Sequence, residues 1–468
     1  MRPTNVMYFV MLFLLARPTL ALSGEEAVAS VGALEVGDEA VLMADGPGGT
    51  MRSFPAVAFG PASSGDSAEA RKGVFLVAWQ EGWQGKGGRS RIYAARVGLD
   101  GKLLDPKGIE IAPCETGVQE YPRVAFFPST PSTGSGQAGS GRGGGVFLVV
   151  WNDMRNGKDC DVLGARVSPE GKVLDKEPIP IAAGPRTQVM PDVAADDKGF
   201  MVVWHGFQGE EVFPKIFAAR VGPDGSRGEP VVVTADSATP RIAWNGKEHL
   251  VIYFSGRSKS WLRMDTSGKT LWNPRRRSWS HIIQGNPLCS TCALPDEKGW
   301  LVVYHGGQPN WWYRSMGIQR VARITPEGKK EAPGDVMGNY RPKGGVPPVN
   351  WLDKSSGGRR NVGGSANTPT VFPYGSSALA RDGEYCVAVW QRYHMGGASG
   401  MELVNGDILA SRLDGWKPLD KGGVCVATSE VEELNPALAG NGAGKLLCVY
   451  EKVVDGRTQI CARIIETQ

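Results

Sequence analysis

One arrangement of apolar and polar positions recurs along the chain. In residues 145–171, GVFLVVWNDMRNGKDCDVLGARVSPEG, an apolar run ends in tryptophan, a polar loop follows, and a second strand-like run ends in arginine before a glycine turn. Short apolar runs bounded by turn residues predict β-strands. The apolar run that ends in an aromatic residue occurs at Val74–Trp79, Val146–Trp151, Phe200–Trp204, His249–Tyr253, Trp300–Tyr304, Tyr385–Trp390 and Leu446–Tyr450.

Each of these runs has a predicted strand on either side. The upstream strand opens with proline in most copies, as in Pro122-Arg-Val-Ala, and a fourth strand such as Ile109-Glu-Ile follows the glycine turn. Four short strands repeated every 40 to 50 residues or so predict a β-propeller, and seven copies predict seven four-stranded antiparallel blades. The downstream strand ends in Arg96, Arg166, Arg220, Arg263, Arg323, Arg412 or Arg463, and a once-per-repeat arginine is most simply a once-per-repeat structural contact.

The last copy ends directly after its third strand, so its blade lacks a fourth strand. Residues 39–44 have the pattern of a fourth strand that leads into the first strand of the next blade. We therefore expect a single all-β domain over residues 36–468, in which the segment 39–44 completes the last blade and closes the ring. Closure removes the exposed sheet edges that promote aggregation. Residues 60–72, 128–144 and 330–368 are predicted insertions between strands.

The first residues have the layout of an export signal. Residues 1–23 contain Arg2, an apolar segment from Val6 to Ala16, and small residues at Ala21 and Ser23, which predicts a signal peptide and a secreted or periplasmic protein. No later segment has the roughly 20 apolar residues of a membrane span. The net charge of +4 over 468 residues is too small to indicate nucleic-acid binding. We expect a monomer without a cofactor.

The repeat VFLVVWNDMRNGKDCDVLGARVSPEGKVLD resembles those of secreted bacterial seven-bladed β-propeller proteins, many of them uncharacterised. The resemblance covers nearly all of the chain after the signal segment and implies the propeller fold. It implies no particular activity, because propellers carry lectins, hydrolases, lyases and docking modules. Sialidase propellers contain the Asp-box Ser-x-Asp-x-Gly-x-Thr-Trp, and the segment Asp265–Trp272 does not match its spacing.

Eight cysteines in an exported chain favour structural disulfides. Cys114 and Cys160 are expected in loops of neighbouring blades on the same face, and we predict that they pair. Cys448 and Cys461 lie on the two strands of the last hairpin and could form a bridge if the register brings their Cα atoms within about 7 Å.

Long loops predict the functional face. The loops between second and third strands and the blade-to-blade connections emerge on one face, which holds the long segments 305–317, 330–368 and 391–407. Aromatic, basic and histidine side chains gather there, and they suit a sugar ring with its apolar face and hydroxyls. The alternative is that the aromatic side chains pack between blades. The candidate ligand-binding residues with these properties are His205, His305, Trp311, Trp312, Trp351, Arg392 and His394.

Three consecutive blades place Arg123, Asp192 and Arg241 directly after the opening proline. This alternating row could satisfy its own charges as ion pairs, or its arginines could hold a carboxylate or sulfate of a ligand. His205 and His305 both follow an anchor aromatic, but two histidines two blades apart lack a third ligand, so we predict no metal site.

Two classes of function remain open. The first is a non-catalytic module that binds a glycan or a protein on the loop-rich face. The second is a carbohydrate-active hydrolase or lyase whose acid and base are among Asp153, Asp353 and Glu451, which the repeat places on that face. Binding needs only a surface, whereas catalysis needs a convergent set of groups.

Overall fold

The computed structural model describes residues 34–42, 51–61, 73–82, 89–128, 145–210, 213–255, 258–273, 289–293, 299–305, 319–331, 336–337, 377–383, 385–396, 402–415, 417–420 and 423–467. All regular elements within these ranges are strands, and none of the described residues belongs to a helix that could span a membrane. All seven predicted apolar runs lie in the second strand of a sheet, where alternate residues face the two neighbouring sheets and both faces are buried. The predicted signal segment, residues 1–23, lies outside these ranges.

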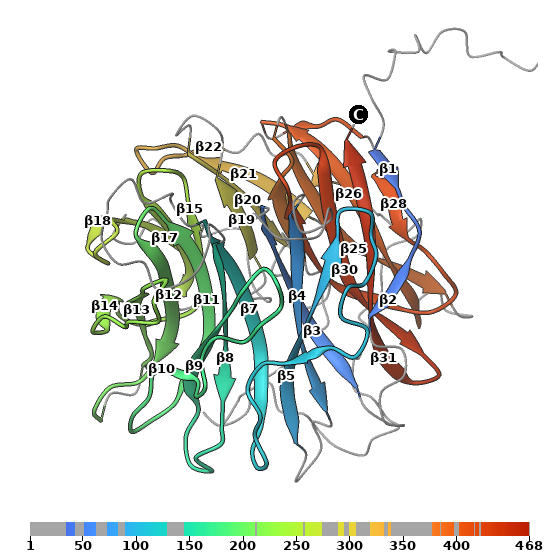
Figure 1. Cartoon of the computed structure of the whole chain (residues 1–468). Helices are drawn as coiled ribbons and strands as arrows, with labels where there is room; N and C mark the ends of the chain where they lie inside the picture. Colours follow the sequence, from blue (N-terminus) through green and yellow to red (C-terminus); the bar gives the residue numbers. More distant parts are fainter. Residues whose placement is uncertain are drawn as a thin grey trace, which may run out of the picture.

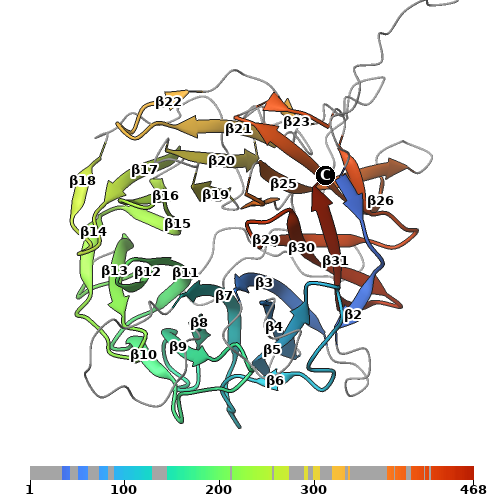
Figure 2. The same ribbon diagram turned by 45° about the horizontal axis from the view of Figure 1, so that its top comes forward.

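The described strands form seven antiparallel sheets arranged in a ring, a β-propeller whose blades we number 1 to 7 (Figures 1 and 2). Blade 1 contains β3 (Arg52–Gly60), β4 (Val74–Gly82), β5 (Ser90–Gly98) and β6 (Ile109–Glu110), and blade 2 contains β7 (Gln119–Phe127), β8 (Val146–Asp153), β9 (Asp161–Val167) and β10 (Ile179–Ala182). Blade 3 contains β11 (Gln188–Asp196), β12 (Gly199–Gly206), β13 (Lys215–Val221) and β14 (Val231–Thr234), and blade 4 contains β15 (Ser237–Trp244), β16 (His249–Ser255), β17 (Ser258–Met264) and β18 (Thr270–Trp272). Blade 5 contains β19 (Cys289–Ala293), β20 (Trp300–His305), β21 (Gln319–Ile324), β22 (Lys330–Glu331) and β23 (Val336–Met337). Blade 6 contains β24 (Ser377–Arg381), β25 (Cys386–Gly396), β26 (Glu402–Asp414), β27 (Lys417–Pro418) and β28 (Val424–Ala427). Blade 7 contains β29 (Glu433–Gly440), β30 (Lys445–Val454) and β31 (Arg457–Thr467), together with β1 (Leu34–Val36) and β2 (Ala40–Leu42) from the start of the chain.

The N-terminal segment closes the ring, as predicted. β2 pairs with β31 from Ala40 opposite Ala462 to Leu42 opposite Ile460, so the first and last strands of the chain share blade 7. β1 pairs with the other end of β31, although the sequence pattern did not predict this strand. The Glu39 carboxylate is fixed between them by Lys452 Nζ at 2.8 Å and by the Tyr450 hydroxyl.

The hydrophobic core is divided among the spaces between blades. Seven clusters of buried side chains are found among the described residues, one between each pair of neighbouring blades. The anchor aromatics Trp79, Trp151 and Tyr450 are fully buried in these clusters. Each blade therefore depends on both neighbours for burial, which is the usual source of stability in repeat architectures.

The seven first strands face the centre of the ring, and Figure 2 shows β3, β7, β11, β15, β19 and β29 around it. Because every blade has the same up-and-down order, these inner strands all begin on one face. The loops between second and third strands open on that face as well. Side chains at the start of an inner strand are thus held by the most rigid part of the fold next to the loop-rich face.

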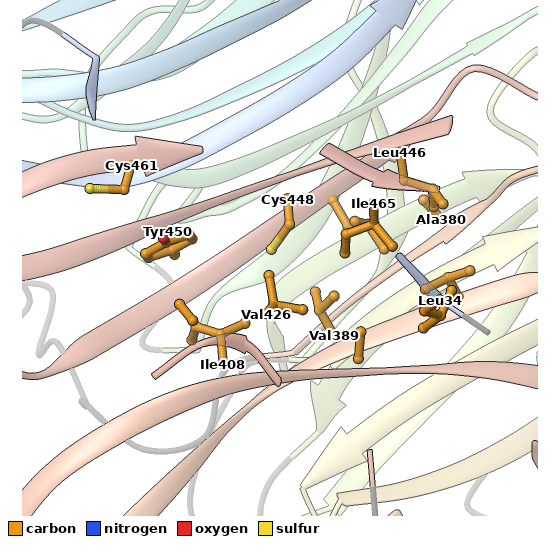
Figure 3. Close-up of a cluster of buried hydrophobic side chains, with 14 residues drawn as sticks. Leu34, Ala380, Val389, Ile408, Val426, Leu446, Cys448, Tyr450, Cys461 and Ile465 are labelled. Atoms are coloured by element: carbon orange, nitrogen blue, oxygen red, sulfur yellow. The ribbon is translucent and has the colours of Figure 1, made fainter. Parts of the chain in front are cut away.

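The predicted disulfides are not formed in the structure, in which Cys114, Cys160, Cys448 and Cys461 carry free thiols. Cys448 and Cys461 share the cluster between blades 6 and 7 (Figure 3), but Cys448 lies opposite Arg463, and Cys461 lies opposite Tyr450. This diagonal offset corresponds to about 7–8 Å, which is beyond the reach of a disulfide without backbone movement. The Cys114 and Cys160 thiols instead contact the carbonyl oxygens of Thr116 and Asp161 in their own loops.

Candidate functional site

A β-bulge recurs at the start of five inner strands. In β3, Ser53 lies opposite Gln80 and Ala56 lies opposite Ala78, so the pair Phe54-Pro55 faces the single anchor residue Trp79. The bulge explains why an opening proline and an anchor aromatic occur together, since proline cannot donate to the ladder and is tolerated at a bulge. The same two-against-one arrangement occurs at Tyr121-Pro122, Met190-Pro191, Thr239-Pro240 and Asn435-Pro436.

The residue before each of these prolines has a left-handed backbone. The φ angles are 56° at Phe54, 55° at Tyr121, 57° at Met190, 50° at Thr239 and 48° at Asn435. This conformation disfavours side chains with a Cβ and costs on the order of 1–2 kcal/mol per residue. Bulges re-aim side chains and are over-represented next to binding and catalytic sites. We call these five positions the bulge residues.

A bulge leaves a backbone N–H without a ladder partner, and in three of the bulges the preceding blade supplies the acceptor. The amide of Met190 donates to Asn152 Oδ1 at 2.8 Å, and the amide of Thr239 donates to His205 Nδ1 at 3.2 Å. The amide of Phe54 donates to Glu451 Oε1 at 2.7 Å. Each acceptor directly follows an anchor aromatic, so this position joins one blade to the inner strand of the next.

Arg123, Asp192 and Arg241 converge from three consecutive inner strands. The distance from Arg123 Nε to Asp192 Oδ1 is 3.7 Å, and Asp192 Oδ2 accepts a 2.8 Å hydrogen bond from the amide of Ile242 in the next blade. Arg241 has an exposed fraction of only 7%. Its Nη1 donates to the carbonyl of Pro240, whereas its Nη2 has no hydrogen-bond partner among the described residues. In this row, Arg123 and Asp192 therefore form an ion pair, whereas the Arg241 guanidinium has one nitrogen without an acceptor among the described residues.

The electrostatics of this cluster are dominated by burial and positive charge. Removal from water, followed by repulsion from Arg241, lowers the pKa of Arg123 to about 10, and Asp192 opposes this effect. The side chain of Arg123 nonetheless remains 24% exposed, so solvent reaches the cluster. Two guanidinium groups and one carboxylate leave an excess of one positive charge. The cluster can accept an anionic group with bidentate hydrogen bonds.

An aromatic pair lies at the start of the inner strands, with Tyr121 two residues before Arg123 on β7. The rings of Phe54 and Tyr121, from blades 1 and 2, have centroids 4.5 Å apart and an interplanar angle of 46°. Tyr121 is buried, and burial together with the carboxylates of Glu120 and Glu451 raises its pKa, while Arg123 opposes the shift.

Two carboxyl groups near this pair are desolvated. Burial raises the pKa of Glu120 to about 7 and that of Glu451 to about 7. Glu451 Oε1 accepts hydrogen bonds from the amide of Phe54 and, at 2.8 Å, from Asn435 Nδ2. The sequence analysis did not identify Phe54, Tyr121 or Glu120. The available signal was their position, at or next to the residue before an opening proline.

The proposed acid and base candidates lie in different settings. Asp153 is buried and accepts hydrogen bonds from Trp151 Nε1 at 2.8 Å, from Gln119 Nε2 at 3.1 Å and from the Arg155 guanidinium at 2.8 Å. Glu451 holds the bulges of blades 1 and 7 through the two bonds given above. Asp353 lies outside the described residues. The contacts of Asp153 and Glu451 are those of carboxylates that hold strands together.

Among the remaining predicted ligand-binding residues, His205 contacts the bulge that precedes Arg241, whereas Arg392 is paired within its own blade. Burial lowers the pKa of His205 to about 4, which keeps the ring neutral and its Nδ1 able to accept from Thr239. Arg392 pairs across the β25–β26 hairpin with Asp407 at 2.7 Å. His305 and His394 are placed in β20 and β25 by their backbones alone. Trp311, Trp312 and Trp351 lie outside the described residues.

The once-per-repeat arginines make repeated structural contacts, as predicted. Each of the three clearest binds a carboxylate of its own blade with two nitrogens and also donates to a carbonyl in the turn of the next blade. These are Arg96 with Asp105 and Pro169, Arg166 with Asp175 and Pro223, and Arg220 with Asp196 and Thr266. We call this contact the arginine clamp. No group of three or more His, Cys, Asp or Glu side chains suited to a metal ion occurs in the described part of the chain.

Among known proteins, the chain is similar to solved structures only. No protein-family model and no curated protein matches the chain. It is similar to a protein of unknown function from Dyadobacter fermentans, with 11% identity over 93% of this chain and 99% of that one and a TM-score of 0.45. It is also similar to a Trypanosoma rangeli sialidase (7% identity, 88% of this chain and 54% of that chain, TM-score 0.42) and to the parainfluenza virus 5 hemagglutinin-neuraminidase ectodomain (10%, 93% and 85%, TM-score 0.42). The chain spans about half the length of that sialidase, and similarities with TM-scores of 0.45 or less do not bear on its function.

Proposed function

We propose that this propeller is a non-catalytic module that binds an acidic saccharide, and that Arg123 and Arg241 hold the acidic group. The observation that carries the proposal is Arg241, which is buried with Nη2 unbonded within the described residues. A buried donor left without an acceptor costs about 1–3 kcal/mol, and more when it is charged. An anionic ligand oxygen would supply the missing acceptor.

The charge around this donor supports an anion rather than a neutral ligand. Asp192 is the one carboxylate in the row, and it is already engaged by the amide of Ile242. Thr239, two residues before Arg241 on β15, also has a buried hydroxyl without a hydrogen-bond partner in the described ranges. A carboxylate or sulfate group could accept from the guanidinium and from this hydroxyl together.

Binding is favoured over hydrolysis by what the carboxylates do. A glycosidase needs two carboxyl groups that are free to exchange protons or attack the sugar. Asp153 and Glu451 instead accept two or more hydrogen bonds each from the protein. We further propose, from the N-terminal segment 1–23, that the module is exported, so that it meets extracellular or periplasmic saccharides.

The test is binding calorimetry with an oligogalacturonate, a heparin-derived oligosaccharide and a neutral oligosaccharide, combined with assays for product release. Wild type should bind at least one acidic probe without cleaving it and should not bind the neutral one. Arg241→Met should lose this binding by at least tenfold. Its thermal stability should be unchanged or higher, because an unpaired buried charge is replaced by an apolar side chain of similar length.

The exposed Arg457 serves as the matched control. Arg457→Met should bind the acidic probe as the wild type does. Equal affinity of wild type and Arg241→Met for the acidic probe would contradict the proposal, as would release of shortened products by the wild type.

A further inference from the structure

The bulge residues next to the arginine cluster have side chains that local backbone preference does not explain. Glycine adopts a left-handed φ without cost, and asparagine tolerates it. Of the five bulge residues, Asn435 follows this preference. Phe54, Tyr121 and Met190 instead place large apolar groups at φ angles of 55–57° in three consecutive blades.

These three side chains occupy the same bulge position in consecutive blades, and we call them the apolar wall. Phe54 packs against Tyr121 across the boundary of blades 1 and 2, and Met190 occupies the same bulge position in blade 3. Tyr121 is 7% exposed, whereas Phe54 and Met190 are half-buried and retain surface that a ligand can cover. Tyr121 lies two residues before Arg123 on β7, and Met190 lies two residues before Asp192 on β11. The apolar wall therefore stands at the start of the same inner strands that carry the charged row.

We infer that Phe54 and Met190, supported by Tyr121, select ligands whose carboxylate is attached directly to a sugar ring, namely hexuronate residues. This inference rests on the proposed binding of an acidic saccharide at Arg123 and Arg241. In a hexuronate the carboxylate and the apolar ring face are only one bond apart, so both can be engaged within one site. Aromatic side chains recognise the apolar face of a pyranose ring, while a few polar groups fix its orientation.

A sulfate ester differs in that its charge stands on a flexible oxygen linkage outside the ring. Inorganic sulfate and acetate have no ring at all. If the wall contributes to recognition, a hexuronate should bind more tightly than any of these, and the difference should depend on the wall residues. If the arginines act alone, replacing a wall side chain should leave the affinities of all these anions unchanged.

The experiment measures the affinities of trigalacturonate, acetate and inorganic sulfate for the wild type and for Phe54→Asn by calorimetry. Asparagine tolerates the left-handed backbone, so the bulge is retained while the ring is lost. Phe54→Asn should bind trigalacturonate at least tenfold more weakly and should bind acetate and sulfate as the wild type does. Met190→Asn should weaken trigalacturonate in the same direction. Phe213→Asn, at a phenylalanine that is 66% exposed, is the matched control and should bind all three anions as the wild type does.

The outcomes separate the two proposals. Absence of binding of trigalacturonate to the wild type would overturn the inference, and absence of binding of the heparin-derived oligosaccharide as well would overturn the proposed function with it. Binding of trigalacturonate that is unchanged in both Phe54→Asn and Met190→Asn would overturn the inference alone. A circular dichroism spectrum and a melting temperature close to those of the wild type are required of each variant, and a loss confined to trigalacturonate cannot arise from unfolding because acetate and sulfate report on the same site.

Discussion

Residues that follow the anchor aromatics differ in chemistry and perform one task. Asn152, His205 and Glu451 each present an acceptor to the amide of a bulge residue in the next blade. From the sequence, polar side chains on the loop-rich face resemble ligand-binding groups. Their partners lie at least 34 residues away in the chain, in a bulge that the apolar pattern does not indicate. The structural use of these side chains was therefore not predictable from local sequence.

Glu451 gives this position a pH dependence. Its pKa is raised from 4.5 to about 7 by burial and by repulsion from Glu432, while the hydrogen bonds from Phe54 and Asn435 oppose the shift. Because the pKa of Glu451 is higher in the folded state than in the unfolded chain, protonation of this carboxyl group stabilises the fold. The stabilisation is fully present below about pH 4.5. This contribution, at most about 3 kcal/mol, is lost as the pH rises through 7.

Glu451→Gln tests this dependence, because an amide resembles the protonated acid and its oxygen can accept both hydrogen bonds. The variant should match the wild type in denaturant unfolding at pH 5 and should be more stable than the wild type at pH 8.5. Glu466→Gln, at a partly exposed site, is the control and should show no such gain. Equal stability of wild type and Glu451→Gln at both pH values would show that the ionised carboxylate is not disfavoured.

At the scale of elements, the arginine clamp couples the third strand of one blade to the turn of the next. The turn glycine is part of this contact, because a Cβ added at Gly171 would lie 2.7 Å from Arg96 Nε. The sequence predicted the glycine from the turn geometry and the arginine from its repetition. The contact between them was not predictable, since they belong to different blades.

Gly171→Ala should therefore destabilise the fold by more than backbone strain alone. The matched control is Gly246→Ala, whose φ of +97° is further from the usual left-handed value than the +85° of Gly171 but which has no atom within 4 Å of the added Cβ. We expect a loss of about 1 kcal/mol for the control and at least about 1 kcal/mol more for Gly171→Ala in urea unfolding. Similar losses for the two variants would mean that the clamp yields without cost.

The sequence pattern predicted the strands better than it predicted the candidate site, and the reason is physical. Apolar runs, prolines and turn glycines report directly on strands and their ends, which made the seven blades and the closing strand predictable. The bulges were hidden because a two-against-one pairing changes the register without changing the alternation of residue types. Alignment of the repeats did identify Arg123, Asp192 and Arg241 as neighbours, since equivalent positions of consecutive blades are adjacent in a ring.

At the scale of the whole molecule, the seven inter-blade clusters form one continuous ring that depends on its closure. Leu42 of β2 is fully buried in the cluster between blades 7 and 1, and Leu34 of β1 is buried in the cluster between blades 6 and 7. The N-terminal segment therefore contributes to the core on both sides of blade 7.

Removal of this segment should open the ring. A chain that begins at residue 44 should be less stable than one that begins at residue 34 by about 4 kcal/mol or more, because two buried leucines and the Glu39 contacts with Tyr450 and Lys452 are lost. It should also aggregate more readily, since β31 becomes an exposed edge. Thermal unfolding and light scattering of the two chains measure both effects. Equal melting temperatures would contradict a structural role for β1 and β2.

The pairing of β2 with β31 also sets the order of events during synthesis. Glu39 and Lys452 are separated by 413 positions in the chain, so the partner of the first strand is synthesised long after it. At about 10 residues per second, the first strand waits about 40 s for it. Throughout that time blades 1 to 6 can assemble as an open arc whose two ends expose strand edges. A chaperone that handles this chain must therefore protect an unfinished ring until β31 has been made.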